Sequence, residues 1–202
     1  MEKFGNAQVK SPDTRQPVVI IVSGPPASGK TNLALKIAQN FALPYFNKDS
    51  IKEILFDKLG WGDIARSRKL NFASMEILYQ IAGAQLVAKC NHILECNFKP
   101  EFDTSRFLDL QKQYGCKYIQ IQCIAEGAVL LERFRQRAKS GIRHPGHVDH
   151  EIESYLEPLL LRGRQGNLEI GDSLFEVDTT DFSKINYQAL FDFISTQLTI
   201  ER

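Results

Sequence analysis

The run of residues 24–31, GPPASGKT, constrains the chain more than any other feature. It fits the pattern G-x-x-x-x-G-K-[ST] and directly follows the apolar run VVIIV of residues 18–22. Apolar residues at helical spacing come next, at Leu33, Ile37 and Phe41. Glycines at both ends let such a loop curl, so that backbone N–H groups point inward and the following helix adds the positive end of its dipole. A strand, this loop and a helix together predict a cradle for phosphate groups.

All eight residues of this loop are expected to contact the phosphates of a nucleotide. They are Gly24, Pro25, Pro26, Ala27, Ser28, Gly29, Lys30 and Thr31. The Lys30 ammonium is expected to reach the β- and γ-phosphates, which gives it a catalytic role, and the Thr31 hydroxyl is expected to hold Mg²⁺.

Bulk composition limits the class of protein. A chain of 202 residues is long enough for one domain with a full core. The 25 basic and 24 acidic residues nearly cancel, so no overall field marks a nucleic-acid or membrane-surface binder. The first sixteen residues are polar, and no apolar run approaches membrane-spanning length. We expect a cytoplasmic protein without membrane contact, with a flexible tail over residues 1–16 and one domain over residues 17–202.

Short apolar runs alternate with longer helical patterns along the chain, which is typical of a parallel sheet covered by helices. Strands are expected near residues 18–23, 44–46, 92–96, 118–123 and 174–177. The predicted fold class is therefore α/β, a three-layer doubly wound sheet of five parallel strands. A helical substrate region is expected at about residues 51–90, with a break near Gly60, and a lid at about residues 133–148.

Asp49 follows the second expected strand, at the carboxyl edge where open α/β sheets bind their ligands. A carboxylate there can accept the proton of an acceptor hydroxyl and orient it, so Asp49 is a candidate general base. Two alternatives remain: a place in the water shell of Mg²⁺, and a simple helix N-cap. Lys52, one helical turn further, would share this face and hold a phosphate or hydroxyl-rich acceptor, unless it is an ordinary exposed lysine.

Glu95 and Asn97 emerge where the third expected strand ends. Glu95 would bind the water shell of Mg²⁺ or a substrate hydroxyl, and Asn97 would position the acceptor. The alternative is that both are polar residues at the start of a loop. Both are candidate substrate contacts.

A basic run, ERFRQRAKSGIRHPGH at residues 132–147, leaves a helix and enters a loop. Arg133 and Arg137 are four residues apart and share a helix face, and Arg143 follows the turn. Cations on a mobile segment can neutralise charge on a phosphoryl group during transfer. We therefore expect Arg133 and Arg137 to be catalytic, and Arg143 and His144 to contact substrate; a solvated basic surface is the alternative.

The motifs, in this order, resemble the P-loop kinases with a nucleoside monophosphate kinase-type fold. More narrowly, they resemble the small ATP-dependent kinases related to polynucleotide kinase and zeta-type toxins, over about residues 18–181. Polynucleotide kinase-like members carry Asp-x-x-Arg after the second strand, with the acid as general base; residues 49–52, DSIK, match with lysine in place of arginine. Their Asp-x-Asn matches residues 95–97, ECN, and their lid arginines match Arg133 and Arg137. The resemblance implies ATP and Mg²⁺ as cofactors.

The leading hypothesis for function is an ATP-dependent kinase, a phosphotransferase that moves the γ-phosphate to a hydroxyl or phosphate of a small metabolite or nucleotide. Alternatives are a polynucleotide 5′-end kinase or a zeta-type toxin that acts on a sugar nucleotide. A nucleic-acid partner is secondary because the charges balance. A non-catalytic nucleotide-binding switch is an alternative of another class; a GTPase of that class would need Asn-Lys-x-Asp late in the chain, whereas residues 47–50 read NKDS. The sequence carries no signal for the oligomeric state.

Overall fold

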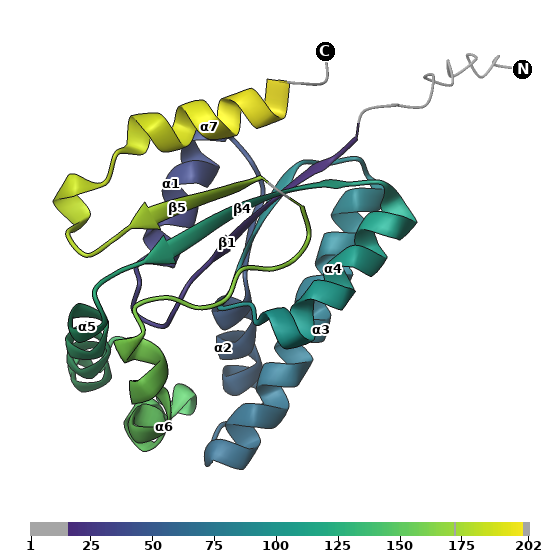
Figure 1. Cartoon of the computed structure of the whole chain (residues 1–202). Coiled ribbons are helices and arrows are strands. Elements are labelled where there is room, and N and C mark those ends of the chain that lie inside the picture. The colour runs from purple at the N-terminus through teal and green to yellow at the C-terminus, as the bar shows by residue number, and fades with distance from the viewer. Residues whose placement is uncertain (1–15, 172, 200–202) are drawn as a thin grey trace, which may run out of the picture.

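The computed structural model describes residues 16–171 and 173–199. Apart from residue 16, the tail predicted over residues 1–16 lies outside the described residues. Five strands form one parallel sheet in the order β2-β3-β1-β4-β5 (Figure 1). The strands are β1 (Val18–Ser23), β2 (Tyr45–Asn47), β3 (His92–Glu95), β4 (Lys117–Ile124) and β5 (Leu174–Asp178). The predicted three-layer doubly wound fold is confirmed.

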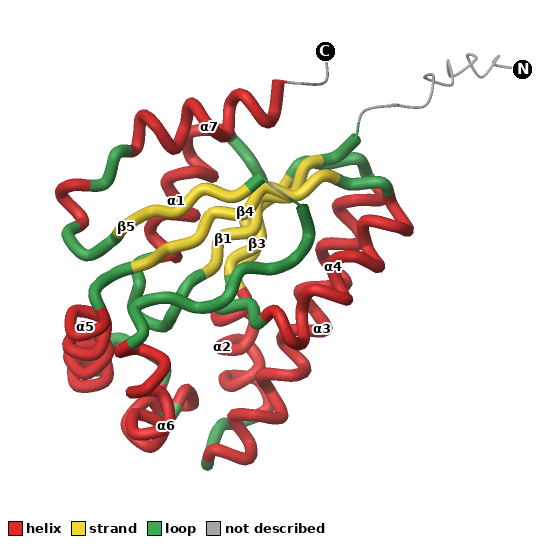
Figure 2. Tube along the Cα trace, in the orientation of Figure 1, coloured by secondary structure: helices red, strands yellow, loops and turns green. Residues whose placement is uncertain are grey.

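Helices connect the strands and cover both faces of the sheet (Figure 2). They are α1 (Lys30–Phe41), α2 (Lys48–Leu59), α3 (Ile64–Val87), α4 (Pro100–Tyr114), α5 (Gly127–Ser140), α6 (Asp149–Leu161) and α7 (Tyr187–Thr199), with 3-10 turns η1 (Pro145–His147) and η2 (Phe182–Lys184). Among the described residues, none of these helices combines the length and the apolar character that crossing a bilayer requires.

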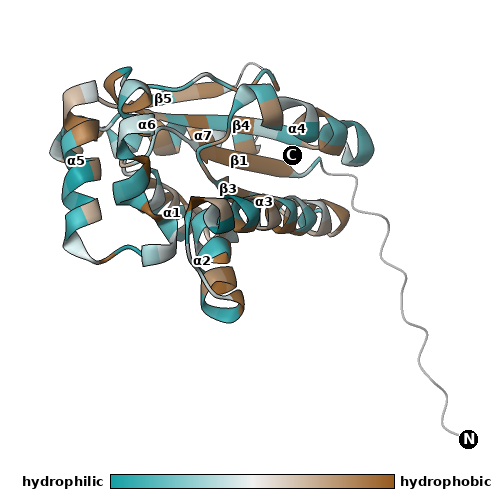
Figure 3. Cartoon of the chain, turned by 90° about the horizontal axis from the view of Figure 1, so that it is seen from below, coloured by the Kyte–Doolittle hydropathy of each residue, from teal (hydrophilic) through white to brown (hydrophobic). Residues whose placement is uncertain are grey.

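The central strand β1 is buried on both faces, which explains its unbroken apolar sequence. Val19 and Ile21 belong to a core that includes residues of α3 and α4, whereas Ile20 faces a second core formed with α1 and α7. Figure 3 shows β1 as a hydrophobic strand in the middle of the molecule. Successive residues of β1 thus enter the two cores in turn, which fixes the register of β1 and therefore the place of the loop that follows it.

The carboxyl ends of all five strands meet at one edge because the strands are parallel. The loop of residues 24–31, called the phosphate loop from here on, leaves β1 at this edge. Helix α2 follows β2 there, and α5 and α6 lie beyond the same edge (Figure 1). A small separate core, which includes Leu130, Phe134 and Leu160, packs α5 against α6. The segment predicted as a lid, residues 133–148, spans the second part of α5 and η1 and ends where α6 begins.

The predicted helical substrate region is built by α2 and α3. It begins earlier than expected, since α2 starts at Lys48 directly after β2. The break predicted near Gly60 ends α2 with a positive φ of 79°, and the Asp63 carboxylate caps α3 by accepting a hydrogen bond from the Arg66 N–H at 2.8 Å. The N-terminal turn of α2 thus lies at the carboxyl edge of the sheet.

Candidate active site

The phosphate loop has the curled backbone that its glycines predict. Gly29 adopts a left-handed conformation with φ 78° and is the N-cap of α1, and no side chain caps this helix. The Ser28 N–H turns back to the Pro25 carbonyl at 3.3 Å. The first turn of a helix carries N–H groups without intrahelical partners, so an uncapped start next to a tight loop is suited to bind an anion.

Gly24 lies too close to the backbone of β4 to carry a side chain without a shift of the loop. Its φ is 150°, and a Cβ there would lie 2.6 Å from the carbonyl oxygen of Cys123 on β4. Because the obstacle is backbone in a central strand, the loop must shift instead. We expect Gly24→Ala to lower the free energy of unfolding by about 1–3 kcal/mol and to weaken ATP binding.

Denaturant unfolding and calorimetric titration with a non-hydrolysable ATP analogue measure the two effects. Gly62→Ala is the matched control, since its nearest heavy atom would be Arg66 Cβ at 3.9 Å, an ordinary contact. Equal behaviour of the two variants would show that the close approach of Gly24 to β4 does not shape the loop.

Thr31 and Glu95 meet at the end of the loop, as a magnesium site requires. The Thr31 hydroxyl donates to Glu95 Oε2 at 3.0 Å, and the Tyr45 hydroxyl donates to the same oxygen at 3.0 Å. The side-chain amide of Asn47 donates to it as well. Burial raises the pKa of Glu95, while the Lys30 charge opposes this rise. Hydroxyl and carboxylate oxygens next to a phosphate site are ligands that Mg²⁺ favours, so these residues fit the ion.

Asp49 is held between two cations at the start of α2. Its Oδ1 lies 2.6 Å from Lys48 Nζ, and its Oδ2 accepts a hydrogen bond from the Arg143 guanidinium at 2.8 Å. Burial alone would raise the pKa of Asp49, but the charges of Lys48 and Arg143 outweigh it and hold the pKa well below its ordinary value. The N-cap alternative for Asp49 is wrong: Asn47 caps α2, with its side chain accepting from the Ser50 N–H at 2.7 Å. Asp49 is therefore ionised and free of a capping role.

Lys52 is buried, so the alternative of an ordinary exposed lysine is wrong. Only 6% of the residue is exposed, and its Nζ donates to the Ser67 hydroxyl of α3 at 3.0 Å. Burial, and then the neighbouring charge of Lys48, lower the pKa of Lys52 to about 8. A partly desolvated ammonium one turn from Asp49 is suited to hold a polar or anionic group.

Two arginines of α5, which lie in the segment predicted as a lid, face the phosphate loop across a hollow. Arg133 and Arg137 line a hollow of about 260 Å³. The other residues around it are Ala27, Gly29, Lys30, Thr31, Asn32 and Phe182. Arg133 donates to the carbonyls of Thr179 and Thr180, both at 2.8 Å. The hollow therefore brings six of the predicted residues around one space: Ala27, Gly29, Lys30 and Thr31 from the loop, and the two arginines.

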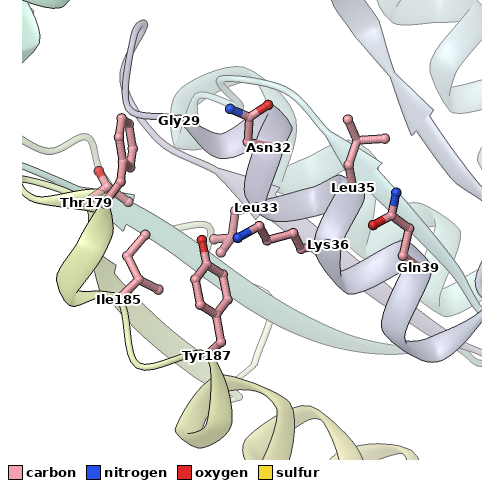
Figure 4. A pocket seen from close by; sticks show the side chains of 10 residues that line it. Gly29, Asn32, Leu33, Leu35, Lys36, Gln39, Thr179, Ile185 and Tyr187 are labelled. Carbon is pink, nitrogen blue, oxygen red and sulfur yellow. The ribbon is translucent and has the colours of Figure 1, made fainter.

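A larger hollow of about 370 Å³ lies alongside, between α1 and the segment that follows β5 (Figure 4). Gly29, Asn32 and Phe182 line both hollows. Lys36 faces Tyr187 across it, with Nζ 4.0 Å from the ring centre (Figure 4). The Arg133 guanidinium stacks on the Phe182 ring at 4.0 Å, at the boundary of the two. Flat, partly apolar surfaces next to a phosphate site are suited to a nucleotide base.

His144 and Asn97 contact residues outside the phosphate loop. The His144 ring stacks on Phe56 of α2 at 4.9 Å, and its Nε2 lies 3.2 Å from Asp57 Oδ1. Asn97 is half-buried, and its Oδ1 accepts from the Cys96 thiol at 3.5 Å. The structure therefore places His144 against α2 and Asn97 near the end of β3. The side-chain hydrogen bonds among the described residues join neither of them to the phosphate loop.

Sequence reasoning missed several residues that shape this site. Tyr45 and Asn47 hold Glu95, Phe182 meets Arg133, and Asp149 pairs with Arg137 at 3.1 Å and with Arg143 at 3.4 Å. Asn47 alone carried a usable signal, since Asn is a favoured N-cap and α2 begins at the next residue.

The parallel sheet of five strands and the phosphate loop that follows β1 define the class of the fold: the protein has a P-loop kinase fold. The chain belongs to the AAA_33 family, described as AAA domain, whose pattern matches residues 19–159. A crystal structure from Chloroflexus aurantiacus J-10-fl, provisionally assigned as a kinase, is 36% identical with a TM-score of 0.82, over 90% of this chain and 98% of that one.

Two further comparisons show a lower identity or match a smaller part of the chain. A sugar kinase from Janibacter sp. HTCC2649 is 18% identical with a TM-score of 0.52, over 93% of this chain and 96% of that one, which shows a shared fold alone. The cytidylate kinase of Staphylothermus marinus is 38% identical over 61 residues, which are 30% of this chain and 29% of that protein. This chain thus matches under a third of the length of that curated relative.

Proposed function

We propose that the protein transfers the γ-phosphate of ATP to a hydroxyl or phosphate group of a small metabolite or nucleotide. The observation that carries the proposal is the hollow at the carboxyl edge of the sheet, where Lys30, Thr31, Arg133 and Arg137 surround one space. Asp49 lies close enough to Glu95 for its charge to raise the pKa of that carboxyl, so the candidate base belongs to the same edge.

The residues of the chain divide the work. The loop N–H groups and the start of α1 hold the phosphates, and Lys30 with the two lid arginines stabilises the charge that spreads over the transferred group. Thr31 and Glu95 would hold Mg²⁺, which neutralises phosphate charge when bound. Asp49 orients the acceptor hydroxyl and takes its proton, a modest demand in phosphoryl transfer.

The acceptor is assigned to the side of α2. Asp49 and Lys52 project from its first turns, and Arg143 and His144 approach it from the lid. A kinase that acts on a small nucleotide is among the partial relatives, and this supports a small-molecule acceptor. The resemblance to polynucleotide kinases and zeta-type toxins adds nucleic-acid ends and sugar nucleotides as acceptors to be tested.

Acceptor-stimulated release of ADP tests the proposal. The panel holds nucleoside monophosphates including CMP, sugars and sugar acids, sugar nucleotides and a 5′-hydroxyl oligonucleotide, each with ATP and Mg²⁺, and mass spectrometry identifies the product. We expect one class to raise ADP release above the rate with water, and chelation of Mg²⁺ to abolish the effect. Tight nucleotide binding with no transfer to any acceptor or to water would instead favour a binding module.

A further inference from the structure

A chain of polar contacts joins α2 to the segment between α5 and α6. The Glu53 carboxylate lies 2.9 Å from His147 Nε2, and His147 Nδ1 lies 3.0 Å from a terminal nitrogen of Arg143. The same guanidinium nitrogen donates to Asp49 Oδ2 at 2.8 Å. Glu53 and Asp49 are one helical turn apart on α2, so the chain closes a ring through the lid segment and back to the candidate base.

Hydrogen-bond chemistry fixes the state of the imidazole. A guanidinium only donates, so Nδ1 of His147 must accept from Arg143, and the ring proton must then sit on Nε2, which donates to Glu53. Burial, and then the charge of Arg143, lower the pKa of His147 to about 2. Among the other charges from α2, Asp49 raises the pKa of the ring, whereas Lys52 and Lys48 lower it further. A neutral ring with the proton on Nε2 is thus the form that completes the chain.

Packing holds the ring in this place. The His147 side chain is 4% exposed and meets the Phe56 ring of α2 edge to face at 5.4 Å. A Cβ on the preceding Gly146 would lie 2.8 Å from both Phe56 and Trp61, so this turn lies tightly against the substrate region. Arg143 itself is on a loop, and it is held by the ring on one side and by Asp49 and Asp149 on the others.

We propose that His147 is a positioning residue, which holds the Arg143 guanidinium on the carboxylate of Asp49 and thereby keeps the candidate base oriented. The proposal rests on the phosphotransfer reaction proposed above, and it gives a role to a histidine whose side-chain hydrogen bonds, among the described residues, run to Glu53 and Arg143. The ring acts through its Nδ1 lone pair, because that atom is the one that meets Arg143.

Two amide variants separate the two nitrogens of the ring. The Asn side chain in His147→Asn keeps an acceptor oxygen near the position of Nδ1. The Gln side chain in His147→Gln keeps a donor near Nε2 and removes the acceptor that the ring offers to Arg143, which then retains only Asp49 and Asp149. We expect kcat to fall roughly 10-fold in His147→Gln with KM for ATP unchanged, an effect of the size seen for groups that orient a functional side chain. His147→Asn should retain most of kcat.

Carboxyl NMR of Asp49 supplies a readout that packing alone would not move. The pKa of Asp49 should rise in His147→Gln and stay near its wild-type value in His147→Asn, because only the former removes the Nδ1 acceptor that holds Arg143 on the Asp49 carboxylate. Equal losses of kcat in both variants with an unchanged Asp49 titration would overturn the proposal and leave His147 a packing residue.

Imidazole NMR of the wild-type protein tests the inference without any acceptor or variant. The His147 signals should show the neutral ring protonated at Nε2 from about pH 8 to pH 4, whereas an unperturbed histidine titrates near 6.5. Ordinary titration, or a proton on Nδ1, would overturn the proposal even in an active enzyme. If the ring shows the predicted tautomer but the protein transfers no phosphate to any acceptor, the proposed function is overturned, whereas the assigned state of the ring stands.

Discussion

Replacing Lys30 with alanine is expected to lower ATP turnover by a factor on the order of 10³ while the fold persists. Lys30 lines the hollow beside the phosphate loop together with Arg133 and Arg137, and its ammonium is close enough to the loop to donate to the Pro25 carbonyl at 3.2 Å. Charge that develops on a phosphoryl group during its transfer is stabilised by cations already in place. The two arginines belong to a separate helix, so they cannot replace the cation that Lys30 places at the loop.

The fold should survive this change because Lys30 begins α1 and is only half-buried, and alanine is the best helix former. ADP release and thermal unfolding of the same preparation measure the two outcomes. Lys58→Ala, which removes an exposed lysine from the end of α2, is the control and should turn over ATP like the wild type. Turnover by Lys30→Ala within a few-fold of the wild type would refute the assignment of this loop to phosphate transfer.

The parts of the site that local sequence could predict are those that one segment builds by itself. The phosphate loop depends on residues 24–31 and on the strand before it, so its glycines and Lys30 could be assigned from a motif. The sheet could be predicted for a related reason: β1 carries an apolar run that only a strand buried on both faces explains. The carboxyl edge, and with it Asp49 and Glu95, then follows from parallel pairing.

The other parts depend on contacts between distant segments, and no local pattern encodes these. Arg133 could be assigned to the lid by its charge, but its partners Thr179 and Thr180 lie more than forty residues away, and its stacking on Phe182 depends on the path of the chain after β5. The burial of Lys52 likewise depends on α3 packing over it, so an exposed helical lysine was an equally good interpretation before the fold was known.

Replacing Asp49 with asparagine is expected to lower the rate of phosphoryl transfer by a factor on the order of 10² or more and to leave ATP binding unchanged. The change keeps the shape of the side chain and removes the charge that meets Lys48 and Arg143. Lys48 is buried and loses its carboxylate partner, so the free energy of unfolding should also fall by about 1–3 kcal/mol. The transfer assay must therefore be run well below the melting temperature of the variant.

The pH dependence gives the same residue a second test. The cations hold the pKa of Asp49 well below its ordinary value, so the carboxylate stays charged as the pH falls, and protonation of Asp49 should not lower kcat of the wild type above about pH 5. A fall of kcat near pH 6 that is present in the wild type and absent in Asp49→Asn would contradict the low pKa of this carboxyl.

Asp49 has two open roles, base and ligand of the Mg²⁺ water shell, and binding measurements separate them. A base is needed only for transfer, so Asp49→Asn should bind ATP with the wild-type affinity at every Mg²⁺ concentration. A metal-shell ligand would lose affinity for ATP in parallel with the rate, and excess Mg²⁺ would restore part of both. Glu76→Gln is the matched control, since it removes a carboxylate that pairs with Arg106 at 2.7 Å on the exposed side of α3, and its kinetics should equal those of the wild type. Transfer by Asp49→Asn at the wild-type rate would exclude both roles and leave the acceptor hydroxyl to be oriented by Lys52 and Arg143.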